Sequence, residues 1–389
     1  MRRSTFALLT VSLIDELWSG VAVVSAPDVE RSFELDHGGY TLSVFALPLL
    51  LGAIVEAGAE LIVYSLPRRR VLSWSYVALS FSLALCALAP SAWLLGVGLA
   101  LAGAASGAAG AAAEAELVAT HGADLDRVMA RWMVFGGVGD IMSPALIALV
   151  LALHGSYSMG FVIVLLCTLL QSLQFARTGS TAEANYEESE ASVSLLQALR
   201  ESLSDVRLWA WVTGTALCTL LDEIVAALAA LRLRTDLGAS EAQATLCVAA
   251  FAVGVVLGAL LTERVVVRWG WRRVLLASSG ACALALPLVT IAQSISGMTA
   301  GLLVLGACAA PHYPLLLARA YESAPGRTTI VNAMQQVFVI LELLLPPALG
   351  ALADRLGLSA AIALLMLQPL GVFGLALWGG GRAHGPPPQ

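Results

Sequence analysis

The sequence predicts an all-α membrane protein with twelve transmembrane helices in two pseudo-symmetric six-helix bundles. Composition, segment length and an internal repeat lead to this fold class. Of the 389 residues, 59% are hydrophobic and only 12% are charged, whereas a soluble domain averages roughly 25% charged residues. A water-soluble fold has too little interior to bury this much apolar surface, so the solvent around the chain must be lipid.

Twelve apolar segments are long enough to cross a bilayer, which requires about 20 predominantly apolar residues. They cover residues 5–27, 39–66, 72–90, 92–118, 131–153, 158–176, 208–230, 242–267, 274–293, 298–322, 330–353 and 358–378. We therefore expect four parts in the chain. They are an N-terminal bundle over 1–176, a cytoplasmic linker over 177–207, a C-terminal bundle over 208–378 and a disordered cytoplasmic tail over 379–389. Within the linker, residues 193–204 are expected to form a short amphipathic helix.

The basic residues predict the orientation of the chain. All 21 are arginine, and with the N-terminus inside only Arg31, Arg232, Arg234 and Arg355 lie on the outer side. Cytoplasmic loops carry an excess of basic residues. The sequence therefore predicts a multi-pass protein of the inner (cytoplasmic) membrane with both termini in the cytoplasm.

An internal repeat relates the two halves. Leu13-Ile14-Asp15-Glu16 in the first span returns as Leu220-Leu221-Asp222-Glu223 in the seventh. Glu60 followed by Arg69-Arg70-Val71-Leu72 returns as Glu263 followed by Arg272-Arg273-Val274-Leu275, with identical spacing. Two six-helix halves that repeat in parallel are related by an axis along the membrane normal.

Acidic residues occur inside the spans, where each costs roughly 2.5–3.5 kcal/mol on insertion scales. They lie in spans 1, 2, 4, 5, 7, 8, 10 and 11, whereas spans 3, 6, 9 and 12 carry no charged residue. Those near mid-span are Asp15, Glu16, Glu56, Asp140, Asp222, Glu223 and Glu342. An intramembrane carboxylate is a functional-site hypothesis by default.

The repeat and this charge pattern resemble the major facilitator superfamily over the whole chain. The resemblance implies that the charged spans line a central cavity and that spans 3, 6, 9 and 12 support it from outside. The family motif between helices 2 and 3, G-x-x-x-D-R-x-G-R-R, is matched poorly, with Glu60 and Glu263 at the position of the first glycine. In its place the first half has Pro67-Arg68-Arg69-Arg70 and the second half has Arg268-Trp269-Gly270-Trp271-Arg272-Arg273. The antiporter motif of helix 5 is matched in part by Gly139 and Pro144, which gives weak support for export.

Candidate residues for proton coupling or substrate binding come from these acids. Asp15 and Asp222 are expected to bind a proton or cation, or alternatively to accept hydrogen bonds from small polar side chains one turn away. Glu16 and Glu223 point about 100° away from them, and the sequence leaves open which member of each pair faces the cavity. Trp18, one turn from Asp15, is a candidate for stacking on a cationic substrate.

Three further acids, Glu56, Asp140 and Glu342, have no basic partner at matching depth. A buried carboxylate without a counter-ion favours its protonated form, which is the property that a proton-coupled carrier needs. Proton coupling and direct substrate contact are both open for these residues.

Residues nearer the cytoplasmic ends are expected to form a gate. Glu116 and Arg319 occupy equivalent positions in spans 4 and 10, so a salt bridge between them is expected. Glu60 and Glu263 are assigned to the same gate.

A metal site is the alternative for the centre of the chain. Cys218 precedes Asp222 by one turn, and His312 lies in the Pro311-His312-Tyr313-Pro314 stretch, where the prolines are expected to break span 10. With Asp15, these side chains form a candidate transition-metal set, although no metal-spacing motif supports it.

The function that we expect is secondary active transport by alternating access, with proton-coupled export of a cationic or neutral amphipathic small molecule. The alternative is a divalent transition-metal exporter, and a membrane-embedded enzyme or a solute sensor is a third class. No enzymatic activity and no cofactor are expected. The expected partners are the substrate, protons and the lipid bilayer, without nucleic acid, and the chain is expected to be a monomer.

Overall fold

The computed structural model describes residues 3–35, 37–63, 66–177 and 195–379. Most of the predicted linker and the predicted tail lie outside the described residues. Of the linker, the helix expected near residues 193–204 forms as α10, Leu195–Ser204. Every regular element in the described ranges is a helix, which confirms the predicted all-α fold class.

The first six predicted spans correspond to the following elements. Span 1 is α1 (Arg3–Val24), followed by the short α2 (Ala26–Ser32). Span 2 is α3 (His37–Tyr40), the π-helical η1 (Thr41–Ala46) and α4 (Leu47–Val63). Spans 3 to 6 are α5 (Arg68–Ala87), α6 (Ala92–His121), α7 (Leu125–Ala152) and α8 (Tyr157–Arg177), with η2 (Gly122–Asp124) before α7.

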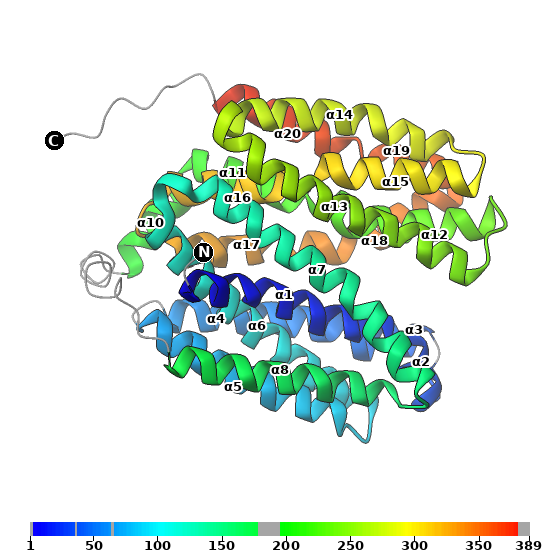
Figure 1. Cartoon of the computed structure of the whole chain (residues 1–389), viewed down its shortest axis with the longest axis horizontal. Coiled ribbons are helices and arrows are strands. Elements are labelled where there is room, and N and C mark those ends of the chain that lie inside the picture. The colour runs from blue at the N-terminus through cyan, green and yellow to red at the C-terminus, as the bar shows by residue number, and fades with distance from the viewer. Residues whose placement is uncertain (1–2, 36, 64–65, 178–194, 380–389) are drawn as a thin grey trace. The chain divides into compact units, whose positions relative to one another are not determined.

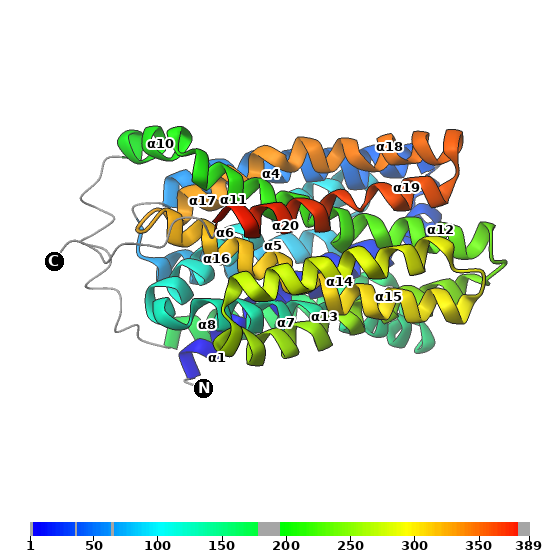
Figure 2. The same cartoon turned by 90° about the horizontal axis from the view of Figure 1, so that it is seen from above.

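The second six spans are more often interrupted. Span 7 is α11 (Val206–Leu217), the π-helical η3 (Leu220–Ile224) and α12 (Val225–Thr235). Spans 8 and 9 are α13 (Glu241–Trp269) and α14 (Trp271–Ile291), and span 10 is α15 (Ile295–Ala309) and α16 (His312–Ser323). Span 11 is α17 (Thr328–Gln335), η4 (Gln336–Phe338) and α18 (Val339–Leu356), and span 12 is α19 (Leu358–Leu364) and α20 (Leu367–Gly379), which follow one another in Figure 2.

Ten helices in the described ranges are long and apolar enough to cross a membrane. The segments at spans 2 and 7 are broken by π-helical turns, so the predicted twelve spans are compatible with the structure. The expected break in span 10 is confirmed at Pro311, because proline lacks the N–H that would continue the helical ladder.

Several helices begin earlier than the hydropathy pattern predicts. α5 begins at Arg68, where the predicted span began at residue 72, and α7 begins at Leu125, where the predicted span began at residue 131. The extra residues carry charge: Arg68, Arg69 and Arg70 in α5, and Asp126 and Arg127 in α7. Arginine is a good helix former and is excluded from a span only by its charge. A hydropathy count therefore locates the lipid-facing part of each helix and misses its polar first turns.

The described chain forms two compact units. The first unit comprises residues 1–125, 135–205 and 321–343, and the second comprises 126–134, 206–320 and 344–389. Each unit therefore includes a short segment from the other half of the sequence. The division at residues 176 and 208, which follows the repeat, stays a prediction.

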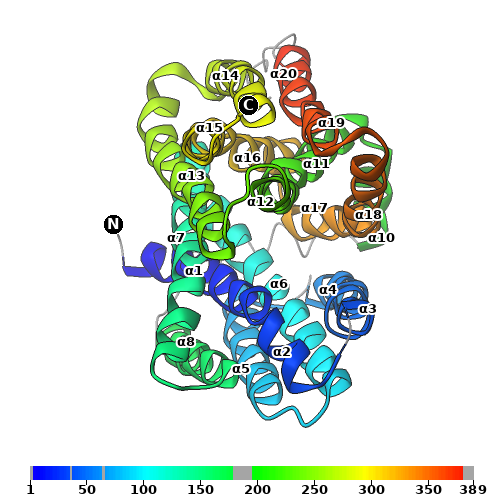
Figure 3. The same ribbon diagram turned by 90° about the vertical axis from the view of Figure 1, so that its right-hand side faces the viewer.

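Each unit is a bundle of closely packed helices. In the first unit, α5 packs against α6 and α8, and α1 also packs against α6 and α8 (Figure 3). In the second unit, α13 packs against α15, and α14 packs against α15 and α20 (Figure 1). The approach of α13 and α15 requires glycine: a Cβ at Gly258 would lie 2.2 Å from the Ala307 carbonyl oxygen. Small residues that let backbones meet are typical of helix contacts in membranes.

Two arginines show the repeat in three dimensions. In the first unit, the Arg69 guanidinium donates to the Phe175 and Ala176 carbonyls at 3.2 and 2.8 Å, near the end of α8. In the second unit, Arg272, its counterpart in the repeat, donates to the Ala376 and Leu377 carbonyls at 3.0 and 3.3 Å, near the end of α20. The last carbonyls of a helix have no partner within it and favour a cation. The repeated arginines thus cap equivalent helices.

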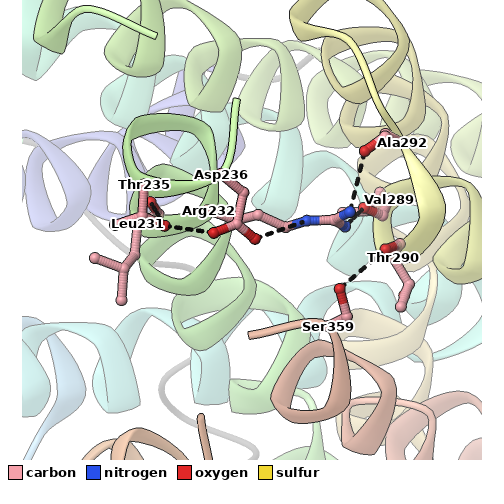
Figure 4. A network of polar contacts seen from close by, with 8 residues as sticks. All are labelled: Leu231, Arg232, Thr235, Asp236, Val289, Thr290, Ala292 and Ser359. Atoms are coloured by element: carbon pink, nitrogen blue, oxygen red, sulfur yellow. Dashed lines mark hydrogen bonds and ion pairs between the residues drawn. The ribbon is translucent and has the colours of Figure 1, made fainter. Parts of the chain in front are cut away.

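A third arginine, Arg232, bonds the last carbonyls of α14 in the second unit. The buried Arg232 of α12 donates to the Val289 and Ala292 carbonyls, the latter at 3.0 Å, at the end of α14 (Figure 4). Asp236 lies 3.7 Å from its Nε and partly balances the charge. This one side chain therefore joins α12 to α14.

Replacing Arg232 by methionine is expected to lower the free energy of unfolding by about 2–3 kcal/mol, because the buried carbonyls lose a charged donor. Thermal unfolding of the purified protein in detergent measures the effect. The control is Arg234→Met, since Arg234 is exposed on the same helix. Equal unfolding temperatures for the two variants would show that the Arg232 contacts add nothing.

Candidate functional site

Asp15 forms the centre of a polar group in the first unit. Ser106 of α6 donates a hydrogen bond to Asp15 Oδ1 at 2.6 Å, and the Trp18 indole N–H donates to the same oxygen at 3.1 Å. Ser106 and Trp18 are both buried, whereas Asp15 is partly exposed. Both of these partners are neutral, so the carboxylate is held in place without neutralisation by either.

Two other predicted acids lie beside Asp15. The side chains of Glu16 on α1 and Asp140 on α7 are hydrogen-bonded to each other. Two carboxyl groups can form such a bond only when one of them carries a proton. Such a pair can hold one proton between two helices.

A glycine on α7 makes this approach possible. A Cβ at Gly139 would lie 2.5 Å from the Leu13 carbonyl oxygen and 2.9 Å from Glu16 Cβ. Gly139 is the glycine that the sequence retains from the helix 5 antiporter motif. Its physical role here is to bring α7 against α1 beside the acids.

Asp222 and Glu223 lie in the π-helical η3 of the second unit. Asp222 is partly exposed and Glu223 is exposed. The Leu221 N–H, one residue earlier, donates to Gln368 Oε1 of α20 at 2.8 Å. A π-helical turn often marks a functional site, and here a side chain from span 12 binds its backbone.

His312 contacts the same glutamine, Gln368. It is fully buried at the start of α16, with its Nδ1 3.3 Å from Gln368 Nε2. Cys218, also buried, contacts the Gly214 carbonyl oxygen at 3.4 Å. In the part of the chain that the structure describes, no three His, Cys, Asp or Glu side chains gather as metal ligands. The contacts of His312 and Cys218 lie within the second unit, and a metal-binding role for them stays a prediction.

Sequence reasoning missed Gln368. A signal was present, because an amide inside the apolar Leu367–Gly379 helix needs a hydrogen-bond partner. Glutamine carries no charge, so Gln368 did not stand out beside the acids of the other spans.

Ion pairs gather at the arginine-rich end of the second unit. Glu263 of α13 accepts from Arg131 at 2.7 Å and from Arg127 at 3.4 Å. Arg319 of α16 pairs with Asp126 and lies over the Trp271 ring, 4.9 Å from its centroid. Asp126, at the start of α7, was not predicted.

In the first unit Glu116 lies 3.8 Å from Arg68. The expected bridge between Glu116 and Arg319 would join the two units and stays a prediction. The side chains of Glu56, Glu60 and Glu342 lie outside the described residues.

A second cluster in the first unit was also missed. The Tyr321 hydroxyl of α16 is hydrogen-bonded to Glu114 Oε2 of α6 and lies 2.7 Å from Asn332 Oδ1 of α17. All three side chains are buried. Glu114 is an acid near the end of span 4, and the sequence indicated no role for it.

Comparison with known families decides the identity of the chain. The family model described as Major Facilitator Superfamily matches residues 8–222 and again 211–388. The chain belongs to the major facilitator superfamily. Each of the two successive matches includes one half of the repeat, and the resemblance inferred from the sequence is confirmed.

Solved structures share the fold of this superfamily member. The fucose:proton symporter FucP of E. coli is 15% identical, with a TM-score of 0.78, over 97% of this chain and 98% of that one. The proton:xylose symporter XylE is 14% identical, with a TM-score of 0.76 and coverage of 97% and 95%. A bacterial homologue of the iron transporter ferroportin is 14% identical, with a TM-score of 0.76 and coverage of 98% and 100%.

A search of curated proteins gave no match. At these identities the solved structures show the fold alone. This major facilitator is therefore a multi-pass membrane protein of a transporter family, and its substrate, coupling and direction are matters for proposal.

Proposed function

We propose that the chain is a secondary active transporter that exports a cationic or neutral amphipathic small molecule in exchange for protons. The observation that carries this proposal is the group of acids around Asp15. The Glu16 and Asp140 carboxyl groups are hydrogen-bonded to each other, which supports a proton shared between them, and the observed donors to Asp15 are the neutral Ser106 and Trp18. Such a group attracts cations and changes its charge by one when the shared proton leaves.

Anionic substrates fit this group poorly, because like charges repel in a medium of low dielectric constant. The structural neighbours FucP and XylE are proton symporters for fucose and xylose, so a neutral solute moving with the proton is the principal competing mode. The proposed orientation, with both termini in the cytoplasm, rests on the positive-inside distribution of arginine.

A direct test uses the purified protein in liposomes with a pH-sensitive dye inside. Addition of the hydrophobic organic cation tetraphenylphosphonium is expected to drive proton movement against the flux of the cation. Proton movement in the same direction as an added neutral sugar, without a response to the cation, would overturn the proposed mode in favour of symport. No proton movement with either probe would count against proton coupling.

The ion pairs of the second unit support a gate at the arginine-rich end. Residues 126–134 of α7 come from the first half of the sequence, and they are tied to α13 through Glu263 and to α16 through Arg319. In alternating access, the contacts that close one end of the cavity break when that end opens. Glu263 and Arg319 are the gate residues of this proposal.

The variant Glu263→Gln is expected to raise the fraction of molecules open at this end by roughly 3- to 10-fold, since two partly exposed ion pairs contribute about 1 kcal/mol together. A single cysteine placed at Val128, in a background without the native cysteines, reports opening through its rate of alkylation. Arg264→Gln is the control, because Arg264 is exposed beside Glu263. An unchanged alkylation rate in Glu263→Gln would remove Glu263 from the gate.

A further inference from the structure

We propose that Glu114 is a proton-binding site, held in its protonated form by Tyr321 and Asn332. The three side chains come from α6, α16 and α17 and meet within the first unit. The sequence search assigned no role to any of them. This site is separate from the Asp15 group, whose hydrogen bonds run to Ser106 and Trp18.

The number of hydrogen atoms in the cluster favours a proton on Glu114. The Tyr321 hydroxyl has one hydrogen, yet it lies within hydrogen-bond distance of both Glu114 Oε2 and Asn332 Oδ1. With a proton on Glu114, the carboxyl donates to the Tyr321 oxygen and Tyr321 donates to Asn332. Every short contact then has its own hydrogen.

The alternative is a charged Glu114 that accepts from Tyr321, with the oxygen and nitrogen of the Asn332 amide exchanged so that the amide donates to Tyr321. This alternative is unfavourable. It would place the amide oxygen at the present Nδ2 position, 3.4 Å from Glu114 Oε2. It would also remove the acceptor of the Gln335 Nε2 contact, now 3.5 Å from Asn332 Oδ1. Two oxygens without a hydrogen between them repel one another.

Charge balance leads to the same conclusion. Glu114 is only 7% exposed, and a buried carboxylate is costly without a cation. Neither α4 nor α17, which both pack against α6, contains a basic residue over 47–63 and 328–335. From α5, Arg68 pairs with Glu116 and Arg69 caps α8. On α16, Arg319 pairs with Asp126.

Asp15 of α1 adds negative charge that acts on Glu114 through space. A second negative charge beside it is unfavourable, which further favours the neutral carboxyl. Release of this proton during transport is an extension that rests on the proposed transport function.

Infrared spectroscopy of the purified protein at neutral pH tests the site without any substrate. The C=O band of a protonated carboxyl is expected to lose one component in Glu114→Gln and to keep it in Glu116→Gln, the matched control that pairs with Arg68. Tyr321→Phe keeps the ring but removes the hydroxyl, so it is expected to shift the frequency of the same component.

An unchanged band in both Glu114→Gln and Tyr321→Phe would overturn the proposal. If Glu114→Gln does not fold, Tyr321→Phe alone tests the proposal. A shift of the C=O component in Tyr321→Phe supports a protonated Glu114, and an unchanged component overturns it. Because no transport is measured, a failure here leaves the proposed function standing. Conversely, a protein without transport activity can still show the band.

Discussion

Asp140→Asn is expected to reduce cation-driven proton movement in liposomes to the level of empty liposomes while the protein stays folded. Asparagine cannot ionise, so the pair with Glu16 loses the proton that we propose is exchanged during transport. Asp15→Asn is expected to have the same effect, because it removes the charge that attracts the cation. The measurement is the rate of internal pH change, with folding checked by thermal unfolding.

The control for these variants is Asp124→Asn, since Asp124 is an exposed acid outside the group. Asp222→Asn tests the equivalent position of the repeat, which lies in the second unit. Full proton coupling in all of Asp15→Asn, Asp140→Asn and Asp222→Asn would move the coupling role to Glu56 or Glu342.

The second large effect separates an organic-cation carrier from a carrier of divalent transition metals. Cys218→Ser and His312→Gln are expected to leave export of tetraphenylphosphonium within about twofold of the parent, since both side chains are buried among packing contacts. Soft and borderline ligands give metal sites their selectivity. Export of manganese, iron or cobalt that disappears in both variants would instead establish the metal exporter.

Trp18 supplies the complementary variant for the cation carrier. Trp18→Ala is expected to lower cation transport by roughly tenfold, because it removes both the aromatic face and the N–H bonded to Asp15. Trp18→Phe keeps an aromatic face and loses only the N–H donor. Activity restored in Trp18→Phe would show that the aromatic ring matters, and continued loss would assign the effect to the hydrogen bond.

The helices and their repetition were predictable because they depend on local properties. A run of about 20 apolar residues becomes a bilayer-spanning helix whatever its neighbours are, since lipid leaves backbone groups no partner outside the segment. The repeated arginines Arg69 and Arg272 had already indicated equivalent positions, and each caps a helix in its own unit. The π-helical turns were not predictable, since no residue type specifies them.

The sequence predicted which acidic residues belong to the candidate sites, but it predicted only some of their contacts. Asp15, Glu16 and Asp140 stood out because a charge inside an apolar span is costly. Their hydrogen bonds depend on how α1 and α7 are rotated, which a single sequence does not specify. Tyr321 and Asn332 gave no comparable signal, because neutral polar residues occur throughout membrane helices.

The sequence by itself determined that the chain spans a membrane, that its halves repeat and which spans carry acids. The tertiary structure alone decided that Glu16 meets Asp140 and that Glu114 meets Tyr321 and Asn332 across more than half of the chain. The physical reason is one of range. Hydrophobic length acts within one helix, whereas a shared proton requires side chains on different helices to approach to hydrogen-bond distance.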